Sequence, residues 1–508
     1  MKKITLILLL LAAIMTLCAC GSGDDNIPTG VNQTKPVTKP ATQVCKDEHT
    51  FAEDSDTCSV CGTDYYSANL EFSLSNSRDY YTLVGLGTCT RTVVRVPATH
   101  KGKPVTTIAT TAFNSVLTPR CQDITEIILP DTITKIESNA FFKCYSLKRI
   151  EMQDGLVEMG SDVLRECTSL ESYRLPSTMT VVPSGILLGC SSLKSVEITG
   201  QVTEVSSMAF YQCTNLESVN LPDSITKIGA LAFNECSNLK TLRLPANIES
   251  VLNDVFTGCT ALEYNEYNGL GYLGNEINPY IALAKVTSTT QTEFAIHDDT
   301  TIMLYDVFTG ANVRSLTVGK SLINIPLSCM KDLTVLEYIS VAEGNPKYHS
   351  AGNCMIETAT KSVVRGSKNS VIPTDGSVTQ IGAYAFAHLT GLTSIVIPAP
   401  IVRLCGDAFA YCEDLEYAVL PNTLTNCEFN IFEYCPKFTR IYFEGNYAQW
   451  SAINIPKSPG GSLSFGNNEV LLESDRYYYS EQQPTTSGKY WHFVDGKPTA
   501  WEEIVDPV

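Results

Sequence analysis

Four side chains of metal-ligand type lie close together near the start of the chain. Cys45, His49, Cys58 and Cys61 follow the pattern C-x3-H-x8-C-x2-C, directly before a glycine. The segment around them is short and polar, so it has little core of its own. Tetrahedral structural zinc takes this ligand set and would supply the folding free energy that the segment lacks. We therefore expect a structural zinc site here, with a disulfide that includes Cys58–Cys61 or Cys45, or no bond at all, as the alternatives.

Common catalytic motifs are absent from the sequence. H-E-x-x-H, G-x-S-x-G and the EF-hand loop do not occur. Gly319-Lys320-Ser321 matches the end of a phosphate-binding loop, but Arg314 stands where that loop needs its earlier glycine. We expect no catalytic residues and no enzymatic activity, and therefore a protein that acts by binding.

A second set of cysteines is regular. Successive members are 23 residues apart, and Leu or Ile follows each of them by three residues. Because each cysteine takes the same inward-facing place, we expect a ladder of buried thiols; equivalent Cα atoms about 5 Å apart leave some oxidation to disulfides open. A fixed period of this length predicts a solenoid. The seven cysteines are Cys121, Cys144, Cys167, Cys190, Cys213, Cys236 and Cys259.

One repeat shows how a coil is built. From Leu216 to Cys236 it reads L-x-x-V-x-L-P-x-x-I-x-x-I-x-x-x-A-F-x-x-C. The first part alternates as a short strand does, and Pro222 ends it because proline cannot donate to a ladder. The I-x-x-I step turns the coil, and the A-F-x-x-C turn closes it with a phenylalanine wedge. Stacked coils bury what one coil cannot.

The pattern L-x-x-I-x-L-P-x-x-I-x-x-I-x-x-x-A-F-x-x-C resembles the BspA-type leucine-rich repeat of bacterial surface proteins over most of 105–445. The resemblance implies a leucine-rich repeat solenoid of mixed α/β type, with a parallel sheet on one face and β caps. It also implies lipid or wall attachment, and for some members adhesion to host matrix proteins or other bacteria. Since fold is not function, the resemblance says little about the ligand.

The start of the chain predicts export. Lys2 and Lys3 precede an apolar run that is too short for a membrane span, as in a secretory signal. Leu17-Cys-Ala-Cys20 resembles the lipobox of bacterial lipoproteins, which implies lipidation of Cys20; plain secretion is the alternative. We expect the protein on the bacterial cell membrane, facing outward and held through this lipid anchor only.

Breaks in the repeat and changes in composition divide the chain. We expect a signal peptide (1–19), a disordered stalk (20–44), the zinc segment (45–62), an N-terminal β cap (63–104), leucine-rich repeats (105–262, 302–341 and 371–445) separated by inserts (263–301 and 342–370), and a C-terminal cap or hairpin tail (446–508).

We call the repeats at 105–262 the first block and those at 371–445 the last block. The strand positions expected to face solvent are the fifth and seventh after each cysteine-type position, and their residue types differ between the two blocks. In the first block they are polar and mixed in charge, as on a solvated face. In the last block they are apolar and aromatic with one arginine, which is typical of contact hot spots. We expect a ligand-binding surface there, although the tail is a candidate cover for it. Its residues are Val396, Tyr417, Val419, Arg440 and Tyr442.

The tail is rich in aromatic residues. Asp495-Gly496 between β-forming residues predicts a hairpin. Trp491 and Trp501 are candidates for stacking on sugar rings, and the alternative is that the hairpin is a lid over the open end of the solenoid.

The net charge of the chain limits the classes of partner that we expect. A net charge of −18 argues against nucleic acid. The expected partner is a host extracellular matrix protein, a mucin glycan or another microbe. The alternatives are a structural surface protein without a dedicated ligand and a glycan-capturing lipoprotein.

Overall fold

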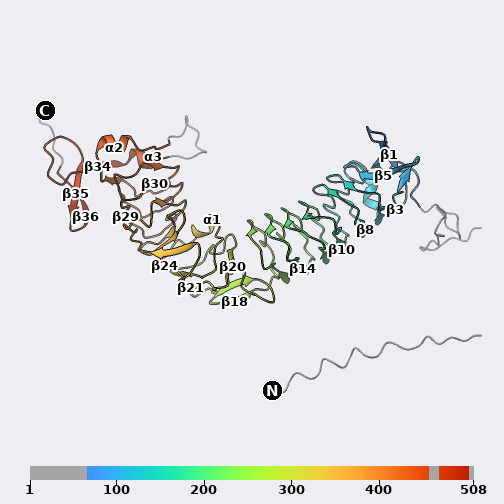
Figure 1. The fold of residues 1–508 in the computed structure, drawn as a ribbon, viewed down its shortest axis with the longest axis horizontal. Coiled ribbons are helices and arrows are strands. Elements are labelled where there is room, and N and C mark those ends of the chain that lie inside the picture. The colour runs from blue at the N-terminus through green and yellow to red at the C-terminus, as the bar shows by residue number, and fades with distance from the viewer. Residues whose placement is uncertain (1–65, 457–467, 503–508) are drawn as a thin grey trace, which may run out of the picture. The chain divides into compact units, whose positions relative to one another are not determined.

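The computed structural model describes residues 66–456 and 468–502. Within them the chain winds as a β-solenoid of about 16 turns, in which equivalent strands of successive turns pair in parallel (Figure 1). The predicted repeat solenoid is confirmed. Each turn exposes an apolar side that only its neighbours can cover, and stacking therefore creates the core.

The first series of strands lies where the L-x-x-I-x-L pattern predicts it, in the sheets β3-β6-β8 and β10-β12-β14-β16. From β6 on, paired residues are 23 positions apart, as Ser195 and Ser218 are. The strands are β3 (Val93–Arg95), β6 (Glu126–Ile128), β8 (Arg149–Glu151), β10 (Ser172–Arg174), β12 (Ser195–Glu197), β14 (Ser218–Asn220) and β16 (Thr241–Arg243).

A second series of parallel strands occupies the I-x-x-I step. We expected this step only to turn the coil and the parallel sheet to lie on one face; the structure corrects both points. Pairing with the same step of the next coil satisfies backbone groups that would otherwise be buried without partners. The strands are β5 (Lys103–Ile108), β7 (Lys135–Ile136), β9 (Glu158–Met159), β11 (Val181–Val182), β13 (Glu204–Val205), β15 (Lys227–Ile228) and β17 (Ser250–Val251).

Helices are few, so mixed α/β overstates the helical content. The described residues hold the 3-10 helix η1 (Pro119–Asp123) and three short α-helices, α1 (Leu327–Met330), α2 (Tyr447–Ser451) and α3 (Glu469–Glu473). In most coils the closing turn contains two residues with positive φ, four positions apart, such as Met208 and Gln212 with φ of 59° and 60°. Left-handed residues cannot continue an α-helix, and the closing segment therefore stays a turn.

A continuous core runs through the stacked coils. The phenylalanine wedges stack on one another, with ring centroids 5.0 Å apart for Phe210 and Phe233 and 5.1 Å apart for Phe386 and Phe409. Burying each such side chain contributes about 1.5–3 kcal/mol. Both repeat blocks therefore share one packing scheme.

The cysteines of the repeat line this core as thiols. Nine of these thiols donate to a backbone carbonyl of the preceding coil, as Cys213 does to Leu187 at 3.2 Å and Cys236 to Phe210 at 3.1 Å. The predicted inward-facing position is confirmed, and the contact explains why a small donor suits it. The same contact is made by Cys144, Cys167, Cys190, Cys259, Cys329, Cys412 and Cys435.

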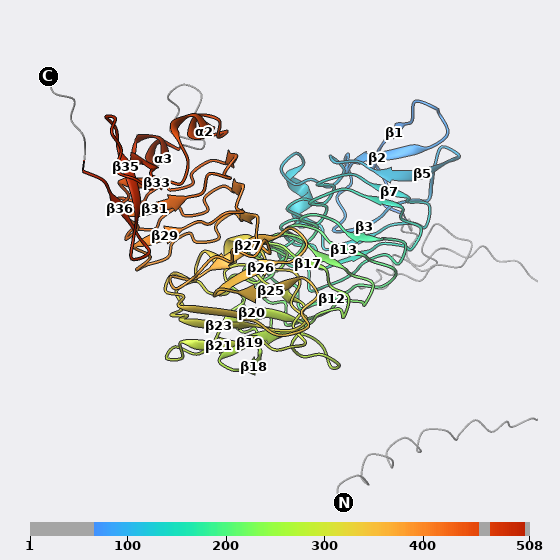
Figure 2. The same cartoon turned by 60° about the vertical axis from the view of Figure 1, so that its left-hand side comes forward.

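Antiparallel strands interrupt the stack after the first block and again near residue 350 (Figure 2). In each interruption the last antiparallel strand pairs in parallel with the next coil, so the solenoid resumes. The strands from the first interruption up to the second are β18 (Asn265–Tyr267), β19 (Leu270–Leu273), β20 (Ala282–Val286), β21 (Glu293–Ala295), β22 (Ile302–Met303), β23 (Ser315–Val318) and β24 (Tyr338–Val341).

The second interruption leads into the last block. Its strands are β25 (Tyr348–Ala351), β26 (Cys354–Glu357) and β27 (Ser362–Gly366), and those of the last block are β28 (Gln380–Ile381), β29 (Ser394–Val396), β30 (Arg403–Leu404), β31 (Tyr417–Leu420), β32 (Asn426–Cys427) and β33 (Arg440–Phe443).

Further strands adjoin both ends of the repeats; their role as caps stays a prediction. The predicted hairpin at Asp495-Gly496 is confirmed, since both residues have positive φ and the strands on either side pair antiparallel. The strands are β1 (Glu71–Leu74), β2 (Tyr81–Gly85) and β4 (Thr99–His100), and β34 (Asp475–Tyr479), β35 (Tyr490–Val494) and β36 (Lys497–Ala500).

Candidate functional site

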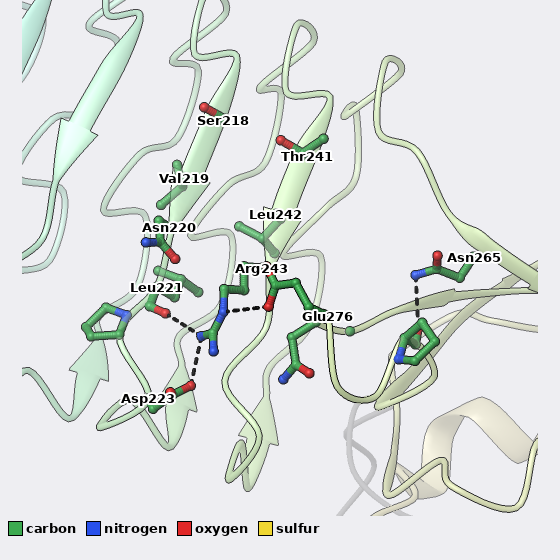
Figure 3. Close-up of a pocket in the computed structure, with 14 residues that line it drawn as sticks. Ser218, Val219, Asn220, Leu221, Asp223, Thr241, Leu242, Arg243, Asn265 and Glu276 are labelled. Carbon is green, nitrogen blue, oxygen red and sulfur yellow. Dashed lines mark hydrogen bonds and ion pairs between the residues drawn. The ribbon is translucent and has the colours of Figure 1, made fainter. Parts of the chain in front are cut away.

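A groove lies on the solvent side of the first block and ends at the first insert (Figure 3). Its larger part has a volume of about 820 Å³ and lies between β14, β16 and the loop after β19. A second hollow of about 390 Å³ continues it across β8, β10 and β12, and Asn220 borders both. We call the two hollows together the first-face groove. Its polar lining is Arg149, Ser172, Arg174, Ser195, Glu197, Ser218, Asn220, Asp223, Thr241, Arg243, Asn265, Asn275 and Glu276.

A column of hydroxyl groups forms the floor of this groove. The residues occupy the fifth position after the cysteine in four successive coils, and strand pairing sets them side by side. All four are exposed, and within the described part of the chain neither their hydroxyls nor the Asn220 amide bonds another protein group. The floor therefore offers unused donors and acceptors at a regular spacing. We call Ser172, Ser195, Ser218 and Thr241 the hydroxyl column.

Two arginines flank the hydroxyl column, and carboxylates hold both in place. The Arg174 guanidinium donates to both carboxylate oxygens of Asp154, at 3.2 and 3.3 Å. The Ser177 backbone N–H at 2.7 Å and the Arg174 guanidinium lower the pKa of Asp154 to about 2. The carboxylate thus stays charged over the ordinary pH range, and the arginine is oriented before any ligand arrives.

Arg243 is fixed in the same way at the other end of the groove. It donates to Asp223 at 2.8 Å, to Glu276 at 3.3 Å and to the Leu221 carbonyl at 3.2 Å (Figure 3). The hydrogen bond from Arg243 lowers the pKa of the Asp223 carboxyl. Glu276 belongs to the first insert, so this bond joins the insert to the repeat face.

The first insert forms the end wall of the groove. The Asn275 side-chain amide donates to the Leu244 carbonyl at 3.0 Å, and the Leu244 N–H donates to the Gly274 carbonyl at 2.9 Å. Gly274 lets the loop of the insert fold closely on itself, because a Cβ there would lie 2.2 Å from the Asn278 carbonyl oxygen. The wall is therefore anchored to the last regular coil.

The sequence pattern predicted the ligand surface in the last block, and in the structure two of its five residues are buried. Val419 and Tyr442 are buried, at 0% and 4% exposure, beneath Trp491, which is itself at 0%. Tyr417 and Arg440 are half-buried, and of the five predicted residues only Val396 is exposed. An apolar strand face is costly to leave in water, and the tail covers most of this one.

The two tryptophans of the tail are engaged within the chain. Trp491 donates its indole N–H to the Phe443 carbonyl at 3.0 Å, and its ring lies 5.5 Å from that of Tyr442. Trp501 donates to the Ser480 carbonyl at 2.9 Å and stacks on His492 at 3.6 Å. Trp491 therefore cannot serve as a sugar platform in this conformation. Its contacts are those of a cover over the last block, which agrees with the alternative that the tail is a cover.

The sequence analysis did not predict the first-face groove, because its polar residues of mixed charge have the composition of an ordinary solvated surface. A usable signal existed: small hydroxyl residues recur every 23 positions at 172, 195, 218 and 241, directly before the repeat breaks at 263. When one side-chain type recurs at the same strand position of successive coils, the pairing of the strands lines these side chains up in a column. The insert that interrupts the repeat beside them can then form a wall.

Two predicted sites lie outside the described residues: the lipidation site Cys20, and the zinc site of Cys45, His49, Cys58 and Cys61. In the ranges 66–456 and 468–502, no three His, Cys, Asp or Glu side chains gather as a metal site. A helix of membrane-spanning length and hydropathy is likewise not found in those ranges.

The sequence profile of the BspA type Leucine rich repeat region matches this chain in six copies. The matched residues are 106–231, 189–287 and 365–454, which together make up more than half of the chain. No curated protein matches it.

Three similar solved structures are a leucine rich cell surface protein from Faecalibacterium prausnitzii, a leucine-rich repeat protein from Bacteroides ovatus and the pneumococcal vaccine antigen PcpA. The first is 22% identical with a TM-score of 0.37, over 78% of this chain and 98% of its own. The second is 16% identical with a TM-score of 0.40, over 81% and 98%. The third is 15% identical with a TM-score of 0.38, over 82% and 93%.

Proposed function

The chain belongs to the BspA-type leucine-rich repeat family, and from this premise we propose that it is a lipid-anchored bacterial surface protein that acts by binding, in the manner of an adhesin. Its partner would be a host extracellular matrix protein, a mucin glycan or another microbe. The first-face groove is the observation that carries the binding function.

Three properties of the groove support this proposal. It is open to solvent, the hydroxyls of its floor bond no other protein group within the described residues, and its arginines and end wall are already held in place. Such preorganisation lowers the ordering cost that a ligand would otherwise have to offset.

A binding array tests the proposal. The purified full chain, kept in mild detergent with zinc and reductant, is applied to immobilised matrix proteins, mucins and glycans. Saturable binding with a Kd in the micromolar range or below supports an adhesin-like function. A folded, monodisperse chain that binds nothing would instead favour the structural surface protein, a role compatible with the many ion pairs that already satisfy its charges.

The proposed lipid anchor rests on Cys20 and the apolar run before it. Acylation of this residue would hold the chain at the membrane without a spanning helix. Metabolic labelling with a fatty-acid analogue should mark the wild-type protein and leave Cys20→Ala unmarked. Labelling that persists in Cys20→Ala would contradict the anchor.

Structural zinc at Cys45, His49, Cys58 and Cys61 is also proposed, on the donor set alone. Metal analysis of the purified chain should give one zinc per molecule and none for Cys58→Ser with Cys61→Ser. A disulfide found between these cysteines by mass spectrometry would contradict it.

A further inference from the structure

We propose that the ligand of the first-face groove is an uncharged glycan chain that crosses the strands, with the hydroxyl column facing its successive sugar units. This inference rests on the proposed binding function and specifies the ligand class. It is carried by the spacing, the bonding capacity and the charge balance of the groove.

The spacing of the hydroxyl column favours sugars over an extended peptide. Neighbouring strands of a parallel sheet lie about 4.8 Å apart, so a chain crossing β10 to β16 meets one hydroxyl at each such step. An extended peptide presents equivalent side chains only every second residue, about 6.6 Å apart, and falls out of step after one strand. A chain of linked pyranose rings advances by about one ring per step, which keeps each unit over its own hydroxyl.

The bonding capacity of the floor also suits sugar hydroxyls. Each serine or threonine hydroxyl both donates and accepts, as sugar hydroxyls do, and the Asn220 amide adds a donor and an acceptor beside Ser218. The sheet backbone beneath them is already paired between strands. A peptide therefore cannot extend this face by backbone pairing and would meet only side-chain hydroxyls.

The charge balance excludes acidic chains. Each of the three arginines in the groove has a carboxylate within 4.0 Å: Glu126 for Arg149, Asp154 for Arg174, and Asp223 for Arg243. A sulfated or carboxylated glycan would have to displace one of these carboxylates to gain an ion pair. The net charge of −18 on the whole chain would also repel an acidic glycan at long range.

The test uses the full chain in mild detergent and four classes of immobilised probe: neutral linear oligosaccharides (gluco-, manno-, galacto- and N-acetylglucosamine series), heparin and hyaluronan, matrix proteins, and unstructured peptides. Ser195→Ala with Ser218→Ala removes the centre of the hydroxyl column. The matched control is Thr180→Ala with Thr203→Ala, two exposed hydroxyl residues of adjacent coils outside the groove. Circular dichroism confirms that each variant folds.

We expect saturable binding of at least one neutral series, about tenfold or more weaker in the serine variant and unchanged in the threonine control, because two hydrogen bonds are lost. Preference for heparin or hyaluronan, or binding of a protein or peptide that the serine variant weakens, would overturn the glycan assignment and leave the binding function intact. Binding that neither variant affects would overturn the groove as the site. A folded chain that binds no probe of any class would overturn this inference together with the proposed function.

Discussion

The solvent sides of the first and last repeat blocks are built from the same strand positions, but one side is open to solvent and the other is largely covered by the tail. On β10 to β16 these positions hold hydroxyls and paired charges and stay open to solvent. On β31 and β33 they hold Val419 and Tyr442, which the tail buries. The repeat therefore dictates the backbone and the core of both blocks, while two side chains per coil decide whether a face is available for binding.

This difference teaches how to interpret an apolar face in a repeat protein. Aromatic and β-branched residues at solvent positions suggested a contact surface, and a contact is what the structure shows, with the chain's own tail as the partner. Val419, Tyr442 and Trp491 form a small separate cluster against which Tyr417 and Tyr477 pack. The polar face that carries the hydroxyl column is the one that stays open to solvent.

Removing the cover of the last block should have the largest effect. Trp491→Ala is expected to lower the free energy of unfolding of this block by about 3–5 kcal/mol, as for other fully buried large side chains. Urea unfolding followed by circular dichroism measures it. The control Trp501→Ala removes a partly exposed ring and should cost clearly less; equal losses would contradict the covered-face account.

The thiol ladder should respond alike in both blocks. Cys213→Ala and Cys412→Ala each remove the thiol donor of a backbone carbonyl, at 3.2 and 3.1 Å in the native chain, although the Leu187 carbonyl keeps the Cys190 N–H at 3.1 Å. Each is expected to lower the free energy of unfolding by about 0.5–1.5 kcal/mol, the usual net contribution of one hydrogen bond. Urea unfolding of both variants checks this, and a loss confined to one block would show that the blocks do not share the ladder.

Burial should also make the ladder thiols unreactive. It raises the pKa of Cys190 and of Cys259 to about 12, so almost no thiolate forms at neutral pH. Alkylation of the native chain, located by peptide mass spectrometry, should leave both residues unmodified at pH 7 and at pH 9, and urea should expose them. Rapid modification of native Cys190 would contradict its place in the core.

The smallest expected effect concerns pH and the ion pairs of the open face. The pKa of Asp154 is lowered to about 2 from the ordinary 3.8, so its contribution to stability is present above about pH 4 and is lost as the pH falls through about 2. Asp154→Asn should therefore lower the melting temperature slightly and equally between pH 7 and pH 4. A difference that already vanishes at pH 5 would show that Arg174 does not hold this carboxylate.

Much of the architecture was predictable because the repeat carries it redundantly. Seven cysteines at one period and the proline after several of the strands impose a local geometry that neighbouring coils repeat, and Asp495-Gly496 sets the hairpin. The second series of strands was not predicted, since two-residue strands such as Lys227–Ile228 are too short to show a period of their own.

The candidate site could be predicted only in part. Which positions face solvent followed from the strand pattern, but which face is covered depends on a tail that lies 48 residues away, as the bond from Trp491 to Phe443 shows. The end wall depends likewise on the insert bond from Asn275 to Leu244. Contacts between segments that share no period leave no mark in either segment alone.

The most direct test of the open-face account is one affinity comparison with the strongest ligand found on the array. Ser195→Tyr with Ser218→Tyr fills the first-face groove with residues that strands tolerate well, and Tyr417→Ala alters the edge of the covered face. We predict that the double variant abolishes binding while Tyr417→Ala leaves the Kd unchanged. Loss of binding in Tyr417→Ala with full binding in the double variant would contradict the account and move the binding surface to the last block.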